Sequence, residues 1–338
     1  MRVTMLGLSG SGKTTYMSAM SEAFYFARPK GFGLKEREGS LYSIFQGKNS
    51  LYNSGEFPAG TNATTNMSLE LLHEQTKLVD IDWIDYRGDA VVETARDGTD
   101  EDCIKATLMV SDIILVFADA VLLNQFKSNI RDARTVIGAN DIIRLLIDLK
   151  NGGNSRNPRI IFLLTKVDSD TVKRDEIASL TRFVYQIYEK FFIDTFTPIS
   201  LCPVFPVGAC GFGKVTTTPV AATDRNQIPR YDNQVPSRWG LSPINITSSF
   251  AAALLLCLEK EMVESIADSL TVESELEKLR KKNNVVRHFI DKLLFGLSFE
   301  HKIESIAEKL AMEREQIKNI ASFKGKLEAL YNETLFQV

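Results

Sequence analysis

The chain has 338 residues, with 40 Lys plus Arg against 43 Asp plus Glu, and a formal net charge of −3 at pH 7. This balance argues against a protein that holds nucleic acid by bulk positive charge. A content of 44% hydrophobic and 25% charged residues excludes a mainly disordered chain. The longest apolar run, residues 250–258, is shorter than the roughly 20 residues of a membrane helix, and the ends match no signal or lipidation motif. We therefore expect no membrane anchor.

The cysteine and histidine residues are scattered along the chain. No C-x-x-C pair occurs, and the three histidines stand far apart. This usage predicts reduced thiols, no Cys/His metal site and a cytoplasmic protein. The cysteines are Cys103, Cys202, Cys210 and Cys257.

In chain order, the apolar pattern first predicts a strand, a helix and a hairpin. Arg2–Leu6 is expected as a short strand that leads at once into glycines, and Thr15–Phe26 follows with helical spacing. Met67–Leu72 and Leu78–Ile84 alternate apolar and polar residues, as half-exposed strands do. The few residues of Glu74–Lys77 join them as a hairpin.

Two continuous apolar runs follow, Ile113–Ala118 and Ile160–Leu164, which are typical of strands buried on both faces. Helical stretches are expected over Ala120–Lys150 and about Asp175–Asp194, and Val204–Val207 is a further short strand. This order predicts a three-layer α/β fold, in which helices cover both faces of a mostly parallel sheet with one antiparallel edge.

The last part of the chain is predicted to be helical. After Pro243 there is no proline, which favours a core helix over Thr247–Ser265 and then several shorter amphipathic helices. We place the domain boundary here, with an α/β domain over residues 1–265 and a C-terminal helical extension over 266–338. Residues 306–320 superficially resemble a helix-turn-helix, but they lack the turn glycine. Because the extension also has equal numbers of acidic and basic residues, docking on the first domain or on a protein partner is favoured over DNA binding.

A phosphate-binding loop connects the first strand to the first helix. Gly7-Leu8-Ser9-Gly10-Ser11-Gly12-Lys13-Thr14 matches G-x-x-x-x-G-K-[ST] at every fixed position. Backbone N–H groups and the helix N-terminus favour phosphate oxygens there. We expect Lys13 to face solvent and reach the β- and γ-phosphates, and the Thr14 hydroxyl to ligate Mg²⁺.

A second motif, at the end of a buried strand, is suited to reading the base. Thr165-Lys166-Val167-Asp168 has the form T-K-x-D, and a carboxylate there accepts from N1–H and N2–H₂ of guanine, a donor pair that adenine lacks. With this motif the chain resembles the Ras-like, translation-factor-related class of P-loop GTPases over about residues 1–265. Thr165 replaces the family's usual Asn, which predicts the loss of some hydrogen bonds that tether the loop.

Two further stretches carry the same resemblance. Asp85-Tyr86-Arg87-Gly88 looks like the family's D-x-x-G, which implies that Asp85 holds Mg²⁺ through water and that the Gly88 N–H meets the γ-phosphate. Gly208-Ala209-Cys210 takes the place of the family's S-A-K loop, which implies that the Ala209 N–H meets guanine O6. The phrases LGLSGSGKTTY, FPAGT and DYRGD together look like the bacterial "double-GTPase" type, which implies a second GTPase subunit or another protein effector, and a conflict or defence system.

The resemblance also implies a switch threonine in the loop before the second strand of the GTPase fold. Thr61 is favoured because it follows Pro58-Ala59-Gly60, Thr64 comes second, and Thr65 is a further candidate. The glycine-rich segment Ala27–Gly60 is expected as a long lid that orders on binding nucleotide or partner. A cap or strand-edge role is the alternative reading of each threonine.

The water-activating group is left open. Asp89 stands where many relatives carry glutamine, and a carboxylate beside a triphosphate is a poor replacement, so a helix cap is its other reading. Candidate arginine fingers are Arg28, Arg37, Arg87 and Arg96, each of which is otherwise a surface charge.

The expected activity is Mg²⁺-dependent hydrolysis of GTP to GDP at a low intrinsic rate, with no nucleic acid partner. Two alternatives remain: an interaction subunit that holds GTP or GDP without turnover, and an ATPase of another P-loop class. The expected nucleotide-binding residues are Gly7, Ser9, Gly10, Ser11, Gly12, Lys13, Thr14, Thr15, Thr165, Lys166, Asp168, Ala209 and Cys210. Those expected to act in hydrolysis are Lys13, Thr61, Gly88 and Asp89, and the expected Mg²⁺ ligands are Thr14, Thr61 and Asp85.

Overall fold

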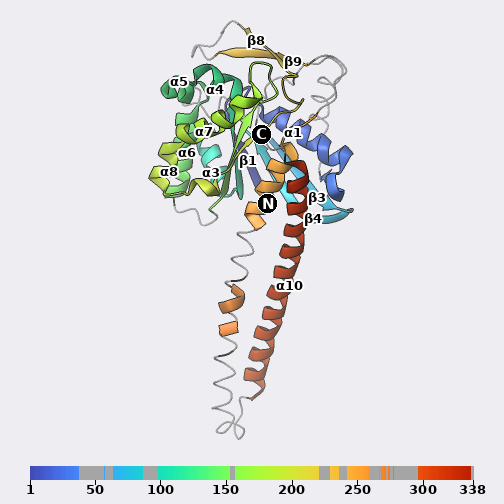
Figure 1. The fold of residues 1–338 in the computed structure, drawn as a ribbon. Coiled ribbons are helices and arrows are strands. Elements are labelled where there is room, and N and C mark those ends of the chain that lie inside the picture. Colours follow the sequence, from blue (N-terminus) through green and yellow to red (C-terminus); the bar gives the residue numbers. More distant parts are fainter. Residues whose placement is uncertain are drawn as a thin grey trace. The chain divides into compact units, whose positions relative to one another are not determined.

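The computed structural model describes residues 1–37, 57, 64–86, 98–152, 157–220, 229–235, 242–258, several positions between 266 and 277, and 296–335 (Figure 1). Its contacts divide the chain into two compact units, which are residues 1–253 with 330–338, and residues 254–329. Ser265, the last residue of the predicted first domain, lies outside the described residues, and that boundary stays a prediction.

A seven-stranded sheet in the order β2-β3-β4-β1-β5-β6-β7 forms the centre of the first unit. The four pairs from β4 to β7 are parallel, while β2–β3 and β3–β4 are antiparallel. The predicted fold class is therefore confirmed. The strands are β1 (Arg2–Leu6), β2 (Phe32–Glu36), β3 (Thr65–His73), β4 (Thr76–Asp85), β5 (Ile113–Asp119), β6 (Arg159–Thr165) and β7 (Val204–Pro206).

Helices cover both faces of this sheet. On one face, Tyr16 of α1 meets Phe117 of β5 edge to face at 5.6 Å between ring centroids, and Phe250, in a helix over residues 246–258, lies 5.7 Å from Trp83 of β4. The opposite face packs against α3 to α8. These helices are α1 (Lys13–Glu22), α3 (Gly98–Met109), α4 (Ala120–Phe126), α5 (Ile130–Val136), α6 (Ala139–Asn151), α7 (Ile177–Ile187) and α8 (Glu189–Thr195).

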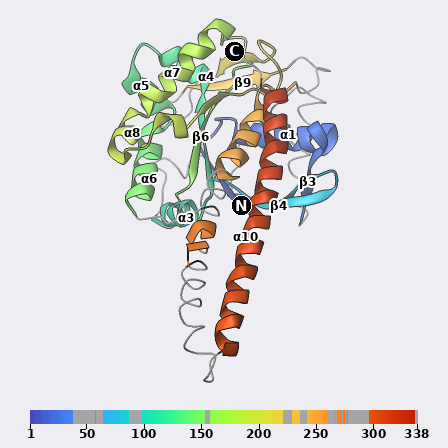
Figure 2. The ribbon, with the colours of Figure 1, turned by 60° about the horizontal axis from the view of Figure 1, so that its bottom comes forward.

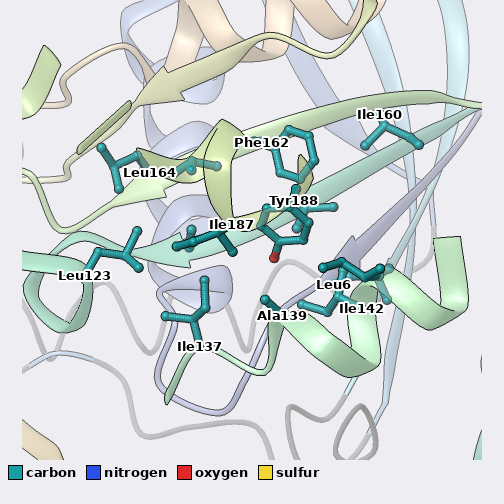
Figure 3. Packing of buried hydrophobic residues seen from close by; sticks show 14 of the residues in the cluster. Leu6, Leu123, Ile137, Ala139, Ile142, Ile160, Phe162, Leu164, Ile187 and Tyr188 are labelled. Carbon is teal, nitrogen blue, oxygen red and sulfur yellow. The ribbon is translucent and has the colours of Figure 1, made fainter. Parts of the chain in front are cut away.

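The core on the α3–α8 side is built around aromatic and branched residues (Figure 3). Tyr188 packs against Phe162 of β6 with 4.6 Å between ring centroids, and both side chains are fully buried. Every residue of β5 is buried, which explains its continuous apolar run, because a strand with helices on both sides has no solvent-facing position.

The hairpin and the helical stretches lie where the sequence pattern predicts them, but one predicted helix is divided into shorter ones. Glu74 and Gln75 both have positive φ, as the two central residues of a tight hairpin turn do. The stretch predicted over residues 120–150 divides into three helices. One break lies at Asn129, whose side chain accepts from the N–H groups of the next turn, and the other at Gly138, which has a φ of 66°.

The segment expected as one long loop, residues 27–60, contains a strand instead at residues 32–36. Short helical turns (η1, Ala23–Ala27; η2, Pro29–Gly31) lead from α1 into β2, which pairs with β3 at the edge of the sheet. Phe32 and Leu34 point into the core and are buried. The lid interpretation is therefore wrong for this part, and residues 38–56 and 58–60 lie outside the described residues.

A second strand pair was also missed by the sequence pattern. β8 (Thr216–Val220) and β9 (Arg230–Gln234) form a separate antiparallel hairpin between β7 and the helix over residues 246–258. Two short turns complete the first unit, η5 (Arg174–Glu176) before α7 and η6 (Ile199–Leu201) before β7.

The C-terminal residues form one helix rather than several short ones. α10 (Gly296–Thr334) runs for 39 residues without a break, so residues 306–320 contain no turn and form no helix-turn-helix, the reading that the sequence already disfavoured. The reason is the absence of proline and of any glycine between its first residue and Gly325. Its end belongs to the first unit, where the Tyr331 ring lies 6.3 Å from that of Phe205. Figure 2 shows α10 from a second direction. None of the described helices is long and apolar enough to cross a membrane.

Candidate functional site

The glycine-rich loop leaves β1 and turns directly into α1. Gly10 and Gly12 have φ values of 76° and 94°, which side chains other than glycine adopt poorly. A Cβ on Gly7 would lie 2.7 Å from Ser11 Oγ and 2.9 Å from Phe117 Cβ, so only glycine fits there. The first turn of α1 therefore opens onto a tight loop of backbone N–H groups, the arrangement that binds phosphate.

Lys13 folds into this loop instead of facing solvent. Its Nζ donates to the carbonyl oxygens of Gly7 at 2.8 Å and Leu8 at 3.0 Å, and the residue is only 5% exposed. The expectation of a solvent-facing lysine is wrong, because two loop carbonyls offer the ammonium group acceptors inside the turn. Its positive charge still lies at the centre of the loop.

Thr14 and Asp85 come together next to this charge. The Thr14 hydroxyl donates to Asp85 Oδ2 at 3.5 Å, and β1 and β4 are neighbours, so that Met5 stands in register with Asp85. Burial raises the pKa of Asp85, while the charge of Lys13 and the Thr14 hydroxyl oppose that rise. Asp85 is 2% exposed, and its Oδ1 makes no hydrogen bond to any of the described residues.

This pair fits a magnesium ion. A hydroxyl and a carboxylate are hard oxygen ligands, and Mg²⁺ takes one or two such protein groups with phosphate and water in its other positions. A buried carboxylate oxygen without a partner is also the group that a cation would satisfy. The described residues contain no cluster of three or more His, Cys, Asp and Glu, so an all-protein metal cage is absent from that part of the chain.

Thr165 joins the loop after β6 to the phosphate loop. Its hydroxyl lies 2.7 Å from the Ser11 carbonyl oxygen and 3.1 Å from that of Ala118, and the residue is buried. A Cβ on Gly12 would touch the Thr165 side chain at 3.4 Å, so that the two loops are in direct contact. Thr165 therefore tethers the phosphate loop, and the loss of some hydrogen bonds compared with asparagine stays a prediction.

Lys166 is fixed by a residue that the sequence analysis missed. It has a positive φ of 60°, and its Nζ binds Asp119 Oδ2 at the end of β5. The other oxygen, Asp119 Oδ1, accepts from Val121 N at 2.9 Å and Leu122 N at 3.2 Å and so caps α4. An Asp directly between an apolar run and a helix was the available signal.

Asp168 lies against the loop after β7, and its hydrogen-bond partners differ from the expected guanine groups. Oδ2 accepts from the backbone N–H groups of Ala209 and Cys210, each at 2.8 Å. The Ala209 N–H that was expected to meet guanine O6 is therefore directed at Asp168 instead. A Cβ on Gly208 would lie 2.8 Å from the Asp168 carboxyl carbon, which explains the glycine at that position.

The electrostatics of this corner follow from burial. Asp168 is 4% exposed, and burial raises its pKa, while the hydrogen bonds from Cys210 and Ala209 and the charge of Lys166 oppose the rise. Burial also raises the pKa of the Cys210 thiol to about 12, and the nearby Asp168 adds to this effect. The thiol is therefore neutral at pH 7 and is no nucleophile.

Some of the other predicted site residues lie within the described part of the chain and some lie outside it. In the phosphate loop, Ser9 is exposed and Thr15 is half-buried. Thr64 is exposed just before β3, and Thr65 opens β3 in register with Asp85, so this stretch reaches the Thr14–Asp85 pair. Outside the described residues lie Thr61, Arg87, Gly88, Asp89 and Arg96.

Neither of the two described candidate arginine fingers lies at the phosphate loop. Arg37 pairs with Asp80 at 3.4 Å, five residues before Asp85 on β4, which is roughly 17 Å along a strand. The Arg28 guanidinium lies beside Gly33 of β2, three strands from β1. A finger role for either arginine is not supported by this arrangement.

Comparisons with known proteins add little to this geometry. No family model matches the chain, and no curated protein matches it. Among solved structures, the chain is similar to the signal recognition particle receptor SRb-GTP/SRX complex from Chaetomium thermophilum, with a TM-score of 0.33 and 12% identity, over 62% of this chain and 93% of that one. The mixed sheet and the loop that follows β1 are by themselves consistent with a P-loop GTPase fold.

Proposed function

We propose that the protein binds GTP with Mg²⁺ and hydrolyses it to GDP and phosphate as a molecular switch. The observation that carries this proposal is the contact between the two loops, in which the Thr165 hydroxyl binds the Ser11 carbonyl at 2.7 Å. It holds a phosphate-binding loop and a loop suited to guanine at neighbouring positions on one edge of the sheet. A bound nucleotide needs the two loops at neighbouring positions, because its phosphates contact one loop and its base contacts the other.

The phosphate side has three contributions. The backbone N–H groups of residues 7–14 and the α1 N-terminus favour the phosphate oxygens, and Lys13 supplies a positive charge. To reach a phosphate, Lys13 has to exchange its two carbonyl partners for phosphate oxygens, which are stronger acceptors. Thr14 and Asp85 would hold Mg²⁺, which neutralises charge on the β- and γ-phosphates.

The base side depends on Asp168. Its Oδ2 accepts from the backbone N–H groups of Ala209 and Cys210, each at 2.8 Å. We propose that guanine N1–H and N2–H₂ donate to this carboxylate and that the Ala209 N–H turns to guanine O6. Asp168 then loses the Ala209 N–H as a donor and gains two donors from guanine. Adenine has no such pair of donors.

The partner and the biological role are the finer part of the proposal. A switch acts by presenting loops whose arrangement depends on the nucleotide. The expected switch residues belong to segments that follow β2 and β4. The resemblance of FPAGT and DYRGD to bacterial double-GTPases supports a protein partner and a role in a conflict or defence system. We propose a second GTPase subunit or an effector protein as that partner.

The test of guanine recognition is the substitution Asp168→Asn, with Asp175→Asn as its control. Asp175 is an exposed carboxylate seven residues further along the chain. We expect Asp168→Asn to weaken GTP binding by more than about tenfold and to admit xanthosine triphosphate, because an amide can donate to xanthine O2. Calorimetry with GTP, ATP and xanthosine triphosphate measures this. Equal affinity of the wild type for ATP and GTP would overturn the proposal.

A further inference from the structure

The β8–β9 hairpin is joined by backbone pairing to the loop that carries Asp168. Val215, just before β8, donates its N–H to the Asp168 carbonyl at 3.0 Å, and its carbonyl accepts from the Asp170 N–H at 2.8 Å. Ser169 and Val215 thereby form an isolated parallel bridge. Figure 1 shows the hairpin over the same end of the sheet as α4. The base loop is thus held from two sides, by the loop after β7 and by the hairpin.

Side-chain hydroxyls extend this attachment into both strands of the hairpin. Ser169 Oγ lies 2.7 Å from Thr217 Oγ1 of β8, and Thr217 Oγ1 donates to Asn233 Oδ1 of β9 at 3.0 Å. Thr217 has only one hydroxyl proton, so Ser169 is the donor to Thr217. Ser169 Oγ in turn accepts from the Thr171 N–H at 3.2 Å. The hydrogen bonds therefore run in one direction from the base loop into β9.

This chain of hydroxyls is shielded from water. Ser169 is fully buried and Thr217 is 7% exposed. Thr217 also donates its backbone N–H to Asp170 Oδ1 at 3.1 Å. Ser169 Oγ also lies 2.8 Å from the Thr171 hydroxyl, which is the donor in that pair when Ser169 donates to Thr217. Because Thr217 is buried, no water can replace its hydroxyl between Ser169 and Asn233. The residues on both sides of Thr217 face solvent, which singles out this one position of β8.

A second contact attaches the other strand to α4. The Tyr231 hydroxyl of β9 hydrogen-bonds to Gln125 Oε1 of α4. α4 begins at Asp119, whose carboxylate holds Lys166 of the base loop. The hairpin thus contacts the base loop directly through Thr217 and a second time through the helix that supports Lys166.

We propose that Thr217 is a positioning residue for guanine recognition, through which the β8–β9 hairpin sets the place of the Asp168 carboxylate. Thr217 touches neither the base nor the phosphates. It acts by fixing Ser169 and Asp170, the two residues after Asp168, against the hairpin. This inference rests on the proposed function, because it assigns a role to Thr217 only if Asp168 reads guanine.

The test compares three variants of β8. Thr217→Val keeps the branched shape and removes the hydroxyl, Thr217→Ser keeps the hydroxyl, and Thr216→Val makes the same change at an exposed neighbour. Each is titrated with GTP and with inosine triphosphate, which lacks the N2 amino group that Asp168 is proposed to bind. Inorganic tripolyphosphate serves as a probe of the phosphate side alone.

We expect Thr217→Val to weaken GTP binding by about tenfold and inosine triphosphate binding by much less, because a displaced carboxylate loses the second donor of guanine. Tripolyphosphate affinity should stay at the wild-type value, and Thr217→Ser and Thr216→Val should keep the wild-type ratio of GTP to inosine triphosphate affinity. A purely structural role would lower the melting temperature of Thr217→Val and leave that ratio unchanged, which would overturn the inference.

The wild-type ratio separates this inference from the proposed function. If the wild type prefers GTP over ATP and inosine triphosphate, and Thr217→Val keeps that preference, only the role of Thr217 is wrong. If the wild type shows no such preference, the guanine assignment of Asp168 is wrong, and the inference about Thr217 is overturned with it.

Discussion

Two carboxylates, Asp85 and Asp168, are buried at the ends of strands, and burial raises the pKa of both. Asp168 accepts from the amides of Ala209 and Cys210, whereas one oxygen of Asp85 has no hydrogen-bond donor among the residues that the structure describes. An ionised group with a raised pKa in the folded state destabilises the fold as the pH rises. If Asp85 holds Mg²⁺ as we propose, the site requires this charge, and the cost in stability is the price of the function.

The substitution Asp85→Asn should therefore raise the melting temperature of the nucleotide-free protein at pH 7. The gain should disappear below about pH 4, where the carboxyl of the unfolded chain is also protonated. The same variant should lose the extra stabilisation that GTP gives in the presence of Mg²⁺. Thermal unfolding between about pH 3 and pH 8, with and without GTP and Mg²⁺, measures both effects, and exposed Asp148→Asn is the control. A lower melting temperature of Asp85→Asn at pH 7 would contradict this account.

Two buried tyrosines offer a second contrast at this scale. Burial raises the pKa of both Tyr16 and Tyr188, but Tyr16 has a partner, since its hydroxyl lies 3.0 Å from Ser249 Oγ. Within the part of the chain that the structure describes, the Tyr188 hydroxyl has no hydrogen-bond partner, and it lies among apolar side chains (Figure 3). The same change of tyrosine to phenylalanine thus removes a hydrogen bond at one position and an unsatisfied group at the other.

We expect Tyr16→Phe to reduce the free energy of unfolding by about 1 kcal/mol, the net value of one hydrogen bond. Tyr188→Phe should leave it unchanged or raise it by up to about 1 kcal/mol, because a buried hydroxyl without a partner is costly. Urea denaturation of both variants beside the wild type measures the difference. A larger loss in Tyr188→Phe than in Tyr16→Phe would show that the hydroxyl of Tyr188 has a partner in solution.

At the scale of elements, β2 replaces a part of what the sequence suggested was a loop. Leu34 is buried and stands opposite Leu71, whereas Lys35 points outward and pairs with Glu70 at 3.4 Å. An edge strand with one buried and one charged face is a usual solution for the open side of a sheet. If β2 packs in this way, neighbouring substitutions should differ strongly in their effect.

Leu34→Ala should reduce the free energy of unfolding by about 2–4 kcal/mol, as large-to-small changes in a core do. Lys35→Ala should change it by less than about 1 kcal/mol, because an exposed ion pair contributes little. Chemical denaturation with matched slopes gives both values. Similar small effects for the two variants would mean that residues 32–36 do not pack on the sheet.

At the scale of the whole molecule, the described part of the chain supplies the phosphate loop and Thr14 and Asp85, the two residues that we propose as magnesium ligands. It places Arg28 and Arg37 away from the phosphate loop. Asp89, which stands in place of the family's glutamine, lies outside the described residues. A chain with these groups, and with no identified arginine finger or water-orienting glutamine, should bind GTP well and hydrolyse it slowly unless a partner completes the site.

We therefore expect steady-state phosphate release by the isolated protein to be slower than about 1 s⁻¹, and a partner that donates an arginine to accelerate it by roughly 10³-fold or more. Asp89→Ala should change the intrinsic rate by less than about tenfold if Asp89 is a helix cap. Faster release by the isolated wild type would show that the chain already holds a complete catalytic set. No release even with its partner would favour the subunit that holds GTP or GDP without turnover.

The sequence alone determined the features that depend on local chemistry. The phosphate loop is readable because its glycines and Lys13 occur at fixed spacing, and both buried strands are readable because helices on two sides demand an unbroken apolar run. The hairpin of β3 and β4 is readable from its alternation and its turn. In each case the residues within a short window suffice to specify the backbone.

Only the tertiary structure decided which groups meet. Thr165 tethers the phosphate loop across 154 positions of sequence, Asp168 binds amides 41 and 42 residues away, and Thr217 reaches Ser169 across 48. The strands β2, β8 and β9 were missed because each is short and is stabilised by pairing with the strand beside it, and β8 has only one buried position. A hydrogen bond between distant residues leaves no period or spacing in a single sequence, because its partner is fixed by how the strands are ordered in the sheet rather than by the neighbouring residues.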